Sequence, residues 1–285
     1  MHHNTNKLLM KTILRLGLVL LMASLPTEQL YANDPPGQIA VSPAMVEMKI
    51  GSKPVSQSIR LKNLKKEAVT LKAEVFNWTL DNQNKLKMMP PDGQSLDQWM
   101  IINPEIFTIE PGKEQVIRFS VRPRTTPLPG EHRAIIYFTE QSPAMSPEGV
   151  EILFKLGVGV YGYADNVRHT SALEGITFDS ASKTLKVDIL NSGNVHTRLK
   201  GDYAIWKKGT FPGFNAINTY LNWPHNKTKP DWFIGAGSMD NTPVLPGTRR
   251  TISTRIPLPA DKNGYVVTVT GTIDDTKVEK VFSVN

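Results

Sequence analysis

Between residues 150 and 160 the sequence alternates with a period of two, and this pattern constrains the fold more than any other feature of the chain. Every even position in it is apolar: Val150, Ile152, Phe154, Leu156, Val158 and Val160. Because successive side chains of a strand point to opposite faces, the pattern predicts a long β-strand with one buried face. Periodicity alone leaves open whether that face is buried in the protein's own core or against a partner.

The rest of the chain reads as short strands separated by turns. Runs rich in Val, Ile, Thr and aromatic residues recur between clusters of Pro, Gly, Asn and Asp, which is typical of strands and their connections. We predict one helical turn near 96–101, and strands at 58–61, 69–78, 115–121, 133–139, 184–190, 198–206, 250–256 and 265–273. This spacing indicates an all-β fold, with two immunoglobulin-like β-sandwich domains in tandem.

The beginning of the chain resembles a secretory signal peptide. Lys7, Lys11 and Arg15 precede an apolar run at 16–25, and a plausible cleavage site follows Ala32. An uncleaved membrane anchor is the alternative, but the run is shorter than the roughly 18–20 apolar residues that span a bilayer. We therefore expect a signal peptide at 1–32 and an exported protein.

A change of composition marks the expected domain boundary. Asp, Asn, Arg and His replace the apolar alternation near 165–170. We expect one sandwich at 33–165, which would carry the alternating strand, and a second at 166–285. Each is long enough to bury a core of its own.

Composition excludes several classes of function. The chain has no cysteine, so it has neither disulfides nor a thiolate for catalysis or metal binding. Its net charge of +7 is spread along the sequence, whereas nucleic-acid binding favours clustered basic residues. His132, His169, His196 and His225 lack metal-ligand spacing, and no hydrolase motif occurs. We therefore expect a binding protein without cofactor or metal, and not an enzyme.

Several motifs in the first half stand in the order found in the periplasmic pilus chaperones. The stretch 103–112 carries a proline-led strand and a Pro-Gly turn, and 115–119 resembles the strand that follows that turn. The stretch 128–138 combines a Leu-Pro turn, a Glu-x-Arg element at Glu131 and Arg133, and an aromatic-rich strand. Together these motifs make the chain similar to the PapD-like family over about 39–163. For Glu131 and Arg133 we leave two possibilities open: pairing with neighbouring charges, or simply solubilising their face.

The resemblance implies a function for the alternating strand. In this family it lies at a sheet edge and is lent to a pilus subunit whose own sandwich lacks a strand. The partners implied are therefore pilus or fimbrial subunits and an outer-membrane usher, and the implied location is the periplasm. The donated residues would be Ile152, Phe154 and Leu156, with Val150 and Val158 at the margins of the strand.

One feature of the family has no counterpart in this sequence. The family holds the subunit's terminal carboxylate with an Arg on the first strand and a Lys on the donor strand. By alignment these positions fall near Met45 or Val46 and near Val158, where no basic residue stands. The candidates to replace them are Lys155 and Lys49, with Arg60 as a further possibility.

Two other signals have competing explanations. The stretch 157–162 matches G-x-G-x-x-G, but no helix follows it to bind a pyrophosphate, so we expect glycines in a strand. The aromatic residues of 211–233 could bind a sugar or a partner, but we favour a small satellite core. The functions that compete with the chaperone are a structural or adhesive β-sandwich protein and a carbohydrate-binding module.

Overall fold

The structure is a computed structural model that describes residues 39–141, 153–224, 227–260 and 264–284. The predicted signal peptide at 1–32 lies outside these residues, as do Val150, Ile152 and His225. Within the described parts of the chain, no helix has the length and apolar character that crossing a bilayer requires.

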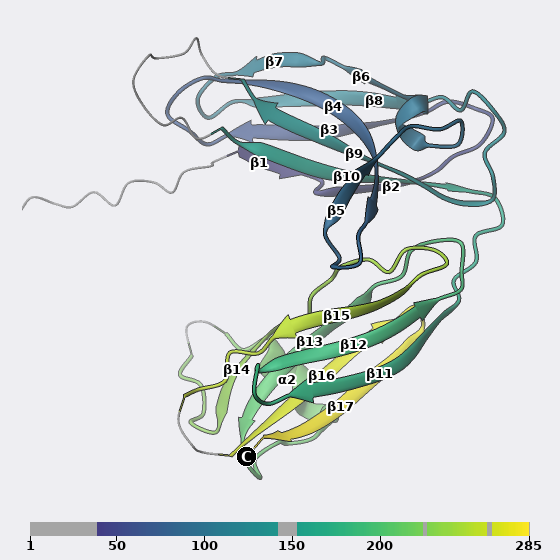
Figure 1. Cartoon of the computed structure of the whole chain (residues 1–285). Coiled ribbons are helices and arrows are strands. Elements are labelled where there is room, and N and C mark those ends of the chain that lie inside the picture. Colours follow the sequence, from purple (N-terminus) through teal and green to yellow (C-terminus); the bar gives the residue numbers. More distant parts are fainter. Residues whose placement is uncertain (1–38, 142–152, 225–226, 261–263, 285) are drawn as a thin grey trace, which may run out of the picture. The chain divides into compact units, whose positions relative to one another are not determined.

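The first half of the described chain folds into two sheets that face each other across one core (Figure 1). One sheet has four strands, in the order β1 (Ile39–Ser42), β3 (Val55–Asn63), β8 (Glu114–Val121) and β6 (Met100–Asn103). The other runs β2 (Met45–Lys49), β10 (Lys155–Ala164), β9 (Gly130–Glu140), β4 (Val69–Leu80) and β5 (Leu86–Met89), and β7 (Ile106–Ile109) also pairs with β4. A 3₁₀ turn, η2 (Leu96–Trp99), precedes β6.

The second half forms a second sandwich with its own core. Its three-stranded sheet has the order β11 (Ser171–Asp179), β12 (Thr184–Asn191) and β15 (Arg249–Arg255). Its four-stranded sheet has the order β14 (Phe233–Ser238), β13 (Leu199–Lys207), β16 (Tyr265–Ile273) and β17 (Thr276–Val284). Short helical turns, η3 (Phe214–Ala216) and α2 (Ile217–Leu221), lie between β13 and β14.

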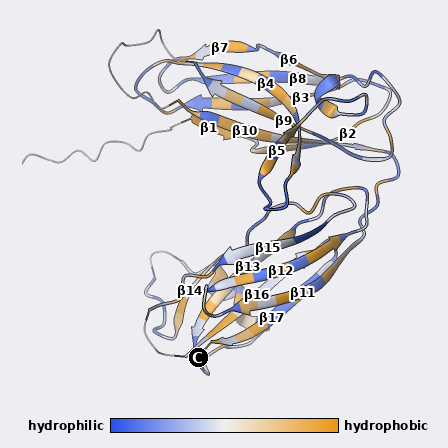
Figure 2. Cartoon of the chain, in the orientation of Figure 1, coloured by the Kyte–Doolittle hydropathy of each residue, from blue (hydrophilic) through white to orange (hydrophobic). Residues whose placement is uncertain are grey.

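Alternation of apolar and polar residues explains both sandwiches. Figure 2 shows hydrophobic and hydrophilic residues interleaved along the strands, and the buried ones gather into one cluster for each sandwich. In β12, for example, Leu185, Val187 and Ile189 are fully buried while Lys186 is exposed. Without disulfides, this burial is the main source of stability.

The prediction of an all-β chain with two β-sandwiches is confirmed. Each predicted run overlaps an observed strand: β3, β4, β8, β9, β12, β13, β15 and β16. The runs at 198–206 and 250–256 each extend one residue beyond their strand. The predicted turn at 96–101 is η2. The segment 165–170 connects β10, which ends the first sandwich, to β11, which begins the second.

The aromatic residues of the second half form a packed layer, as expected. Trp206 of β13 is fully buried and contacts the rings of Phe211, Tyr220, Trp232 and Phe233 at centroid distances of 5.0–6.1 Å. The layer covers part of the face of β13 and β16 that points away from the sandwich core, because Ala204, Trp206 and Val266 belong to it.

Candidate functional site: the open edge of β10

Strand β10 is paired along only part of its length on one side. Along β9 the pairing runs from Lys155 to Ala164. Along β2 it begins only at Gly159, opposite Met45, and runs in parallel to Tyr163. Among the strands that the structure describes, none pairs with the other edge of residues 155–158. The backbone groups on that edge are therefore available to another strand.

The chain switches sheets in a way that explains this open edge. β1 belongs to the four-stranded sheet, and the chain crosses to the other sheet before β2 begins at Met45. A first strand running along the whole of β10 would cover its edge, but β2 is only five residues long. The first half of β10 is therefore left as a sheet edge.

The apolar residues of the alternating strand fall into two groups. Val158 and Val160 are fully buried in the sandwich's own core. Phe154 and Leu156 are half-buried, and Phe154 packs against the margin of that core. Val158 is thus occupied within this protein. Among the predicted donor residues that the structure describes, Phe154 and Leu156 are the ones that a partner can contact.

The opposite face of β10 is built from glycines covered by aromatic rings. A Cβ on Gly157 would lie 2.8 Å from the Ile135 side chain and 3.0 Å from the Tyr137 ring of β9, so a larger residue would require these side chains to shift. Trp78 and Tyr161 pack edge to face on the same surface. The G-x-G-x-x-G stretch therefore lies within a strand, as expected, and no helix follows it.

The predicted anchor residues lie in three different places. The Lys155 Nζ sits 4.2 Å from the centre of the Tyr137 ring, on the aromatic face rather than on the face of Phe154 and Leu156. Arg60 is on the other sheet, where it forms an exposed ion pair of 2.9 Å with Glu114. Lys49 lies at the end of β2 and lines a pocket of about 790 Å³ near the end of β10.

Arg198, which the sequence did not single out, lines the same pocket as Lys49. One Nη donates to the Tyr161 hydroxyl at 3.0 Å, and the other donates to the Asn241 carbonyl. Its Nε is buried and has no partner among the described atoms. Arg198 precedes β13 in the second half of the sequence, so no local pattern could have placed it beside β10.

A buried ion pair lies next to this pocket. The Glu131 carboxylate has no exposed surface and accepts two hydrogen bonds from His196, from Nδ1 at 2.5 Å and from the backbone N–H at 2.8 Å. Arg133 lies 3.4 Å from the other carboxylate oxygen. Burial raises the pKa of Glu131, but the hydrogen bonds and charge of His196 outweigh it and leave the pKa below its ordinary value.

This arrangement decides between the two possibilities left open for Glu131. The residue pairs with a neighbouring charge and does not solubilise its face. Arg133 also stacks over Trp78, with its guanidinium carbon 5.5 Å from the ring centre. His196 gave no signal in the sequence because a lone histidine far from Glu131 carries no pattern.

The structure contains no obvious metal site. In the described parts of the chain, no group of three or more His, Asp or Glu side chains is placed to hold a metal ion. His132 is hydrogen-bonded through both ring nitrogens, to the Gln94 and Leu128 carbonyls, at 2.7 and 2.8 Å. It therefore fixes the loop before β9.

Comparison with solved structures returns fimbrial chaperones, the class of protein that the sequence resembles. The chain is similar to a chain of a chaperone–tip adhesin complex of CFA/I fimbriae biogenesis, with 14% identity and a TM-score of 0.45 over 87% of this chain and 99% of that one. It is similar to the YadV chaperone, with 12% identity and a TM-score of 0.46 over 87% and 100%. For the Pseudomonas aeruginosa CupB2 chaperone the values are 11% and 0.45, over 86% and 100%.

No protein-family model matches the chain, and no curated protein matches it. Because these identities and TM-scores are low, the function proposed below is argued from the residues of this chain.

Proposed function

We propose that this protein is a periplasmic chaperone that binds pilus or fimbrial subunits by lending them the first half of β10. The observation that carries the proposal is the open edge of residues 155–158, flanked by the half-buried side chains of Phe154 and Leu156. The subunits would then pass to an outer-membrane usher.

The physics of strand addition explains why such an edge suits this task. A sandwich that lacks one strand exposes both an unpaired ladder of backbone groups and the apolar residues of its core. A strand lent from β10 would satisfy the ladder through its backbone, while Phe154 and Leu156 would fill the pockets of the groove. Fully burying such a side chain contributes about 1.5–3 kcal/mol, and these two are already half-buried, so each would contribute roughly half of that.

Lys49 and Arg198 are the cations best placed to bind an acidic group of the partner. Both line the pocket near the end of β10, whereas Lys155 is held over Tyr137. A carboxylate bound there would receive charge-assisted hydrogen bonds. We therefore prefer Lys49 over Lys155 as the replacement for the family's lysine, with Arg198 as its partner.

The proposal is tested by co-expressing the tagged full-length chain with a pilin-like fimbrial subunit, and by measuring the subunit recovered from the periplasm. We expect Leu156→Asp to lower the recovery at least tenfold, because a carboxylate in the subunit's groove would be buried without a partner. Leu128→Asp, at an exposed leucine away from β10, is the matched control. Equal recovery with both variants would refute strand donation.

The burial of Val158 and Val160 favours one competing function. These residues use half of the alternating face for the protein's own core, as a structural or adhesive sandwich protein would. That alternative assigns no role to the unpaired edge of residues 155–158.

A further inference from the structure

A second candidate site lies in the second sandwich. It is a groove of about 740 Å³ on the outer face of the four-stranded sheet, lined mainly by residues of β13, β16, β17 and α2. The aromatic layer covers the neighbouring part of that face. Helix α2 contributes to both, with Ile217 and Tyr220 in the aromatic layer and Asn218 and Leu221 in the groove. The groove is thus the uncovered part of the sheet, and α2 forms one wall.

A pair of glycines lets β13 and β16 approach closely beneath this groove. Gly201 of β13 lies opposite Gly271 of β16. A Cβ on Gly271 would lie 2.5 Å from the Lys200 carbonyl oxygen, and one on Gly201 would lie 2.7 Å from the Thr270 carbonyl oxygen. Since these obstacles are backbone atoms, only glycine fits at both positions. The glycine positions face the core, because they alternate along β13 and β16 with the polar residues that project from the outer face.

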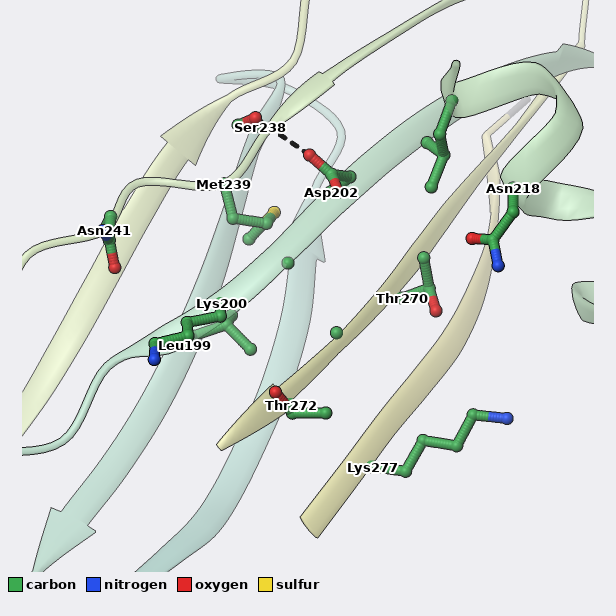
Figure 3. A pocket seen from close by; sticks show the side chains of 13 residues that line it. Leu199, Lys200, Asp202, Asn218, Ser238, Met239, Asn241, Thr270, Thr272 and Lys277 are labelled. Carbon is green, nitrogen blue, oxygen red and sulfur yellow. Dashed lines mark hydrogen bonds between the residues drawn. The ribbon is translucent and has the colours of Figure 1, made fainter. Parts of the chain in front are cut away.

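Polar side chains in the groove are arranged in two rows across the sheet. One row runs across the sheet from Lys200 of β13 to its partner Thr272 of β16 and on to Lys277 of β17. The next row runs from Ser238 of β14 to Asp202 of β13 and on to Thr270 of β16. Figure 3 shows these side chains around the same space, with Asn218 on the helix at one side. One row is cationic, and the other offers hydroxyl groups and a carboxylate.

Most of these groups have hydrogen-bonding capacity to spare. Asp202 accepts a hydrogen bond of 2.9 Å from Ser238, and Lys277 pairs with Glu279 at 2.6 Å. The side chains of Lys200, Asn218, Thr270 and Thr272 form no hydrogen bond or ion pair with residues that the structure describes. Hydroxyl and amide groups both donate and accept, which matches a ligand that carries many hydroxyl groups.

The pairing of the strands argues against a peptide or a nucleic acid in this groove. β13 lies between β14 and β16, and β16 lies between β13 and β17, so the floor has no free strand edge to which a peptide could add. None of the lining residues is aromatic, so there is no platform on which a base could stack.

We propose that this groove binds an acidic oligosaccharide. Its hydroxyl groups would bond to Asp202, Thr270 and Asn218, and its carboxylates would lie along the row of Lys200, Thr272 and Lys277. The volume is within the range of about 300–1,000 Å³ that is typical of ligand sites. All of the lining residues belong to the second sandwich, and two of them, Lys200 and Thr272, also line the pocket that holds Lys49.

Calorimetric titration of the full-length chain tests this proposal with three probes of equal length: tetragalacturonate, neutral tetragalactose and tetraglutamate. We expect tetragalacturonate to bind at least tenfold more tightly than the other two, since it alone has both the hydroxyl groups and the charge. Absence of tetragalacturonate binding would overturn the proposal. Equal binding of tetraglutamate would do the same, because it would show that charge alone is recognised.

Matched variants locate the binding. Asn218→Ala and Lys277→Gln should each weaken tetragalacturonate binding by roughly tenfold, the loss of one good hydrogen bond or ion contact. Asn215→Ala, in the same helical layer, and Lys280→Gln, on the opposite face of β17, are exposed residues outside the groove and should leave it unchanged. Equal effects of groove and control variants would overturn the assignment to this groove. Lys200 and Thr272 are not used, because they also line the pocket that holds Lys49.

Discussion

Nδ1 of His196 donates a hydrogen bond of 2.5 Å to the carboxylate of Glu131, and the two side chains are almost completely buried. Glu131 lies on β9 of the first sandwich, and His196 precedes β13 of the second. The His196 ring also packs on Tyr161 of β10, at a centroid distance of 4.4 Å. A residue of the second sandwich thus helps to fix the strand that carries the proposed function.

This ion pair predicts a specific dependence of stability on pH. The pKa of Glu131 in the folded protein is below its ordinary value of 4.5. The folded state therefore favours the ionised form, and the stabilisation is present above about pH 4.5 and lost as the pH falls through the lower folded-state pKa. Glu131→Gln should lower the free energy of unfolding by roughly 1–3 kcal/mol at pH 7, and by less at pH 3.5. Chemical denaturation at both pH values measures this.

A control for that prediction is Glu174→Gln. Glu174 also pairs with a basic residue, Arg249, at 2.7 Å, but that arginine is 66% exposed. An exposed pair contributes about 0–1 kcal/mol, so this variant should change stability little. The interpretation of Glu131 fails if the two variants lose the same stability, or if the Glu131 variant shows no difference between the two pH values.

We predict that Arg250 stabilises the protein through hydrogen bonds that join the two sandwiches. Its guanidinium donates to the Leu80 carbonyl at 2.9 Å and to the Asp81 carbonyl, at the turn after β4, while Asn84 of the same turn donates to the Thr251 carbonyl at 2.8 Å. Arg250→Ala should cost about 2 kcal/mol, because charged hydrogen bonds to carbonyls are lost. Arg255→Ala, at an exposed site on the same strand, should cost less than about 0.5 kcal/mol. Similar losses in thermal unfolding would argue against this role.

The close approach of Gly201 and Gly271 predicts that adding one methyl group at Gly271 lowers the stability of the protein. Gly271→Ala would place a Cβ 2.5 Å from the Lys200 carbonyl oxygen, and the strands must separate to admit it. We expect a loss of about 1–3 kcal/mol. Gly235→Ala, on β14, meets nothing within 4 Å and should be nearly neutral. Calorimetric melting of both proteins distinguishes them, and equal melting temperatures would contradict the close strand approach.

The sequence predicts strands well where local alternation is strong. The runs at 69–78 and 184–190 fall inside β4 and β12, because their buried positions recur with a period of two. It does not predict β5, whose residues are all exposed, or the start of β10 at Lys155. β10 begins where its backbone starts to pair with β9, at Lys155 opposite Thr139, and the periodicity of the sequence does not show that point.

Long-range contacts explain what the sequence could not predict about the site. The alternating face is buried at Val158 and half-buried at Leu156, and the open edge beside Leu156 depends on where β2 begins, more than a hundred residues earlier. Arg198 and His196 reach β10 from another domain. The aromatic residues of 211–233 were recognised as a core because many lie close together in sequence.

Hydrogen–deuterium exchange on the isolated chain and on its complex with a pilin-like subunit tests strand donation most directly. In the free protein, amides of residues 155–158 that point away from β9 have no strand partner among the described residues and should exchange quickly. Strand addition would bond these amides to the subunit and slow their exchange by at least tenfold, while the amides at 159–163, already paired with β2, would change little. A stable complex in which exchange at 155–158 is unaltered would contradict strand donation.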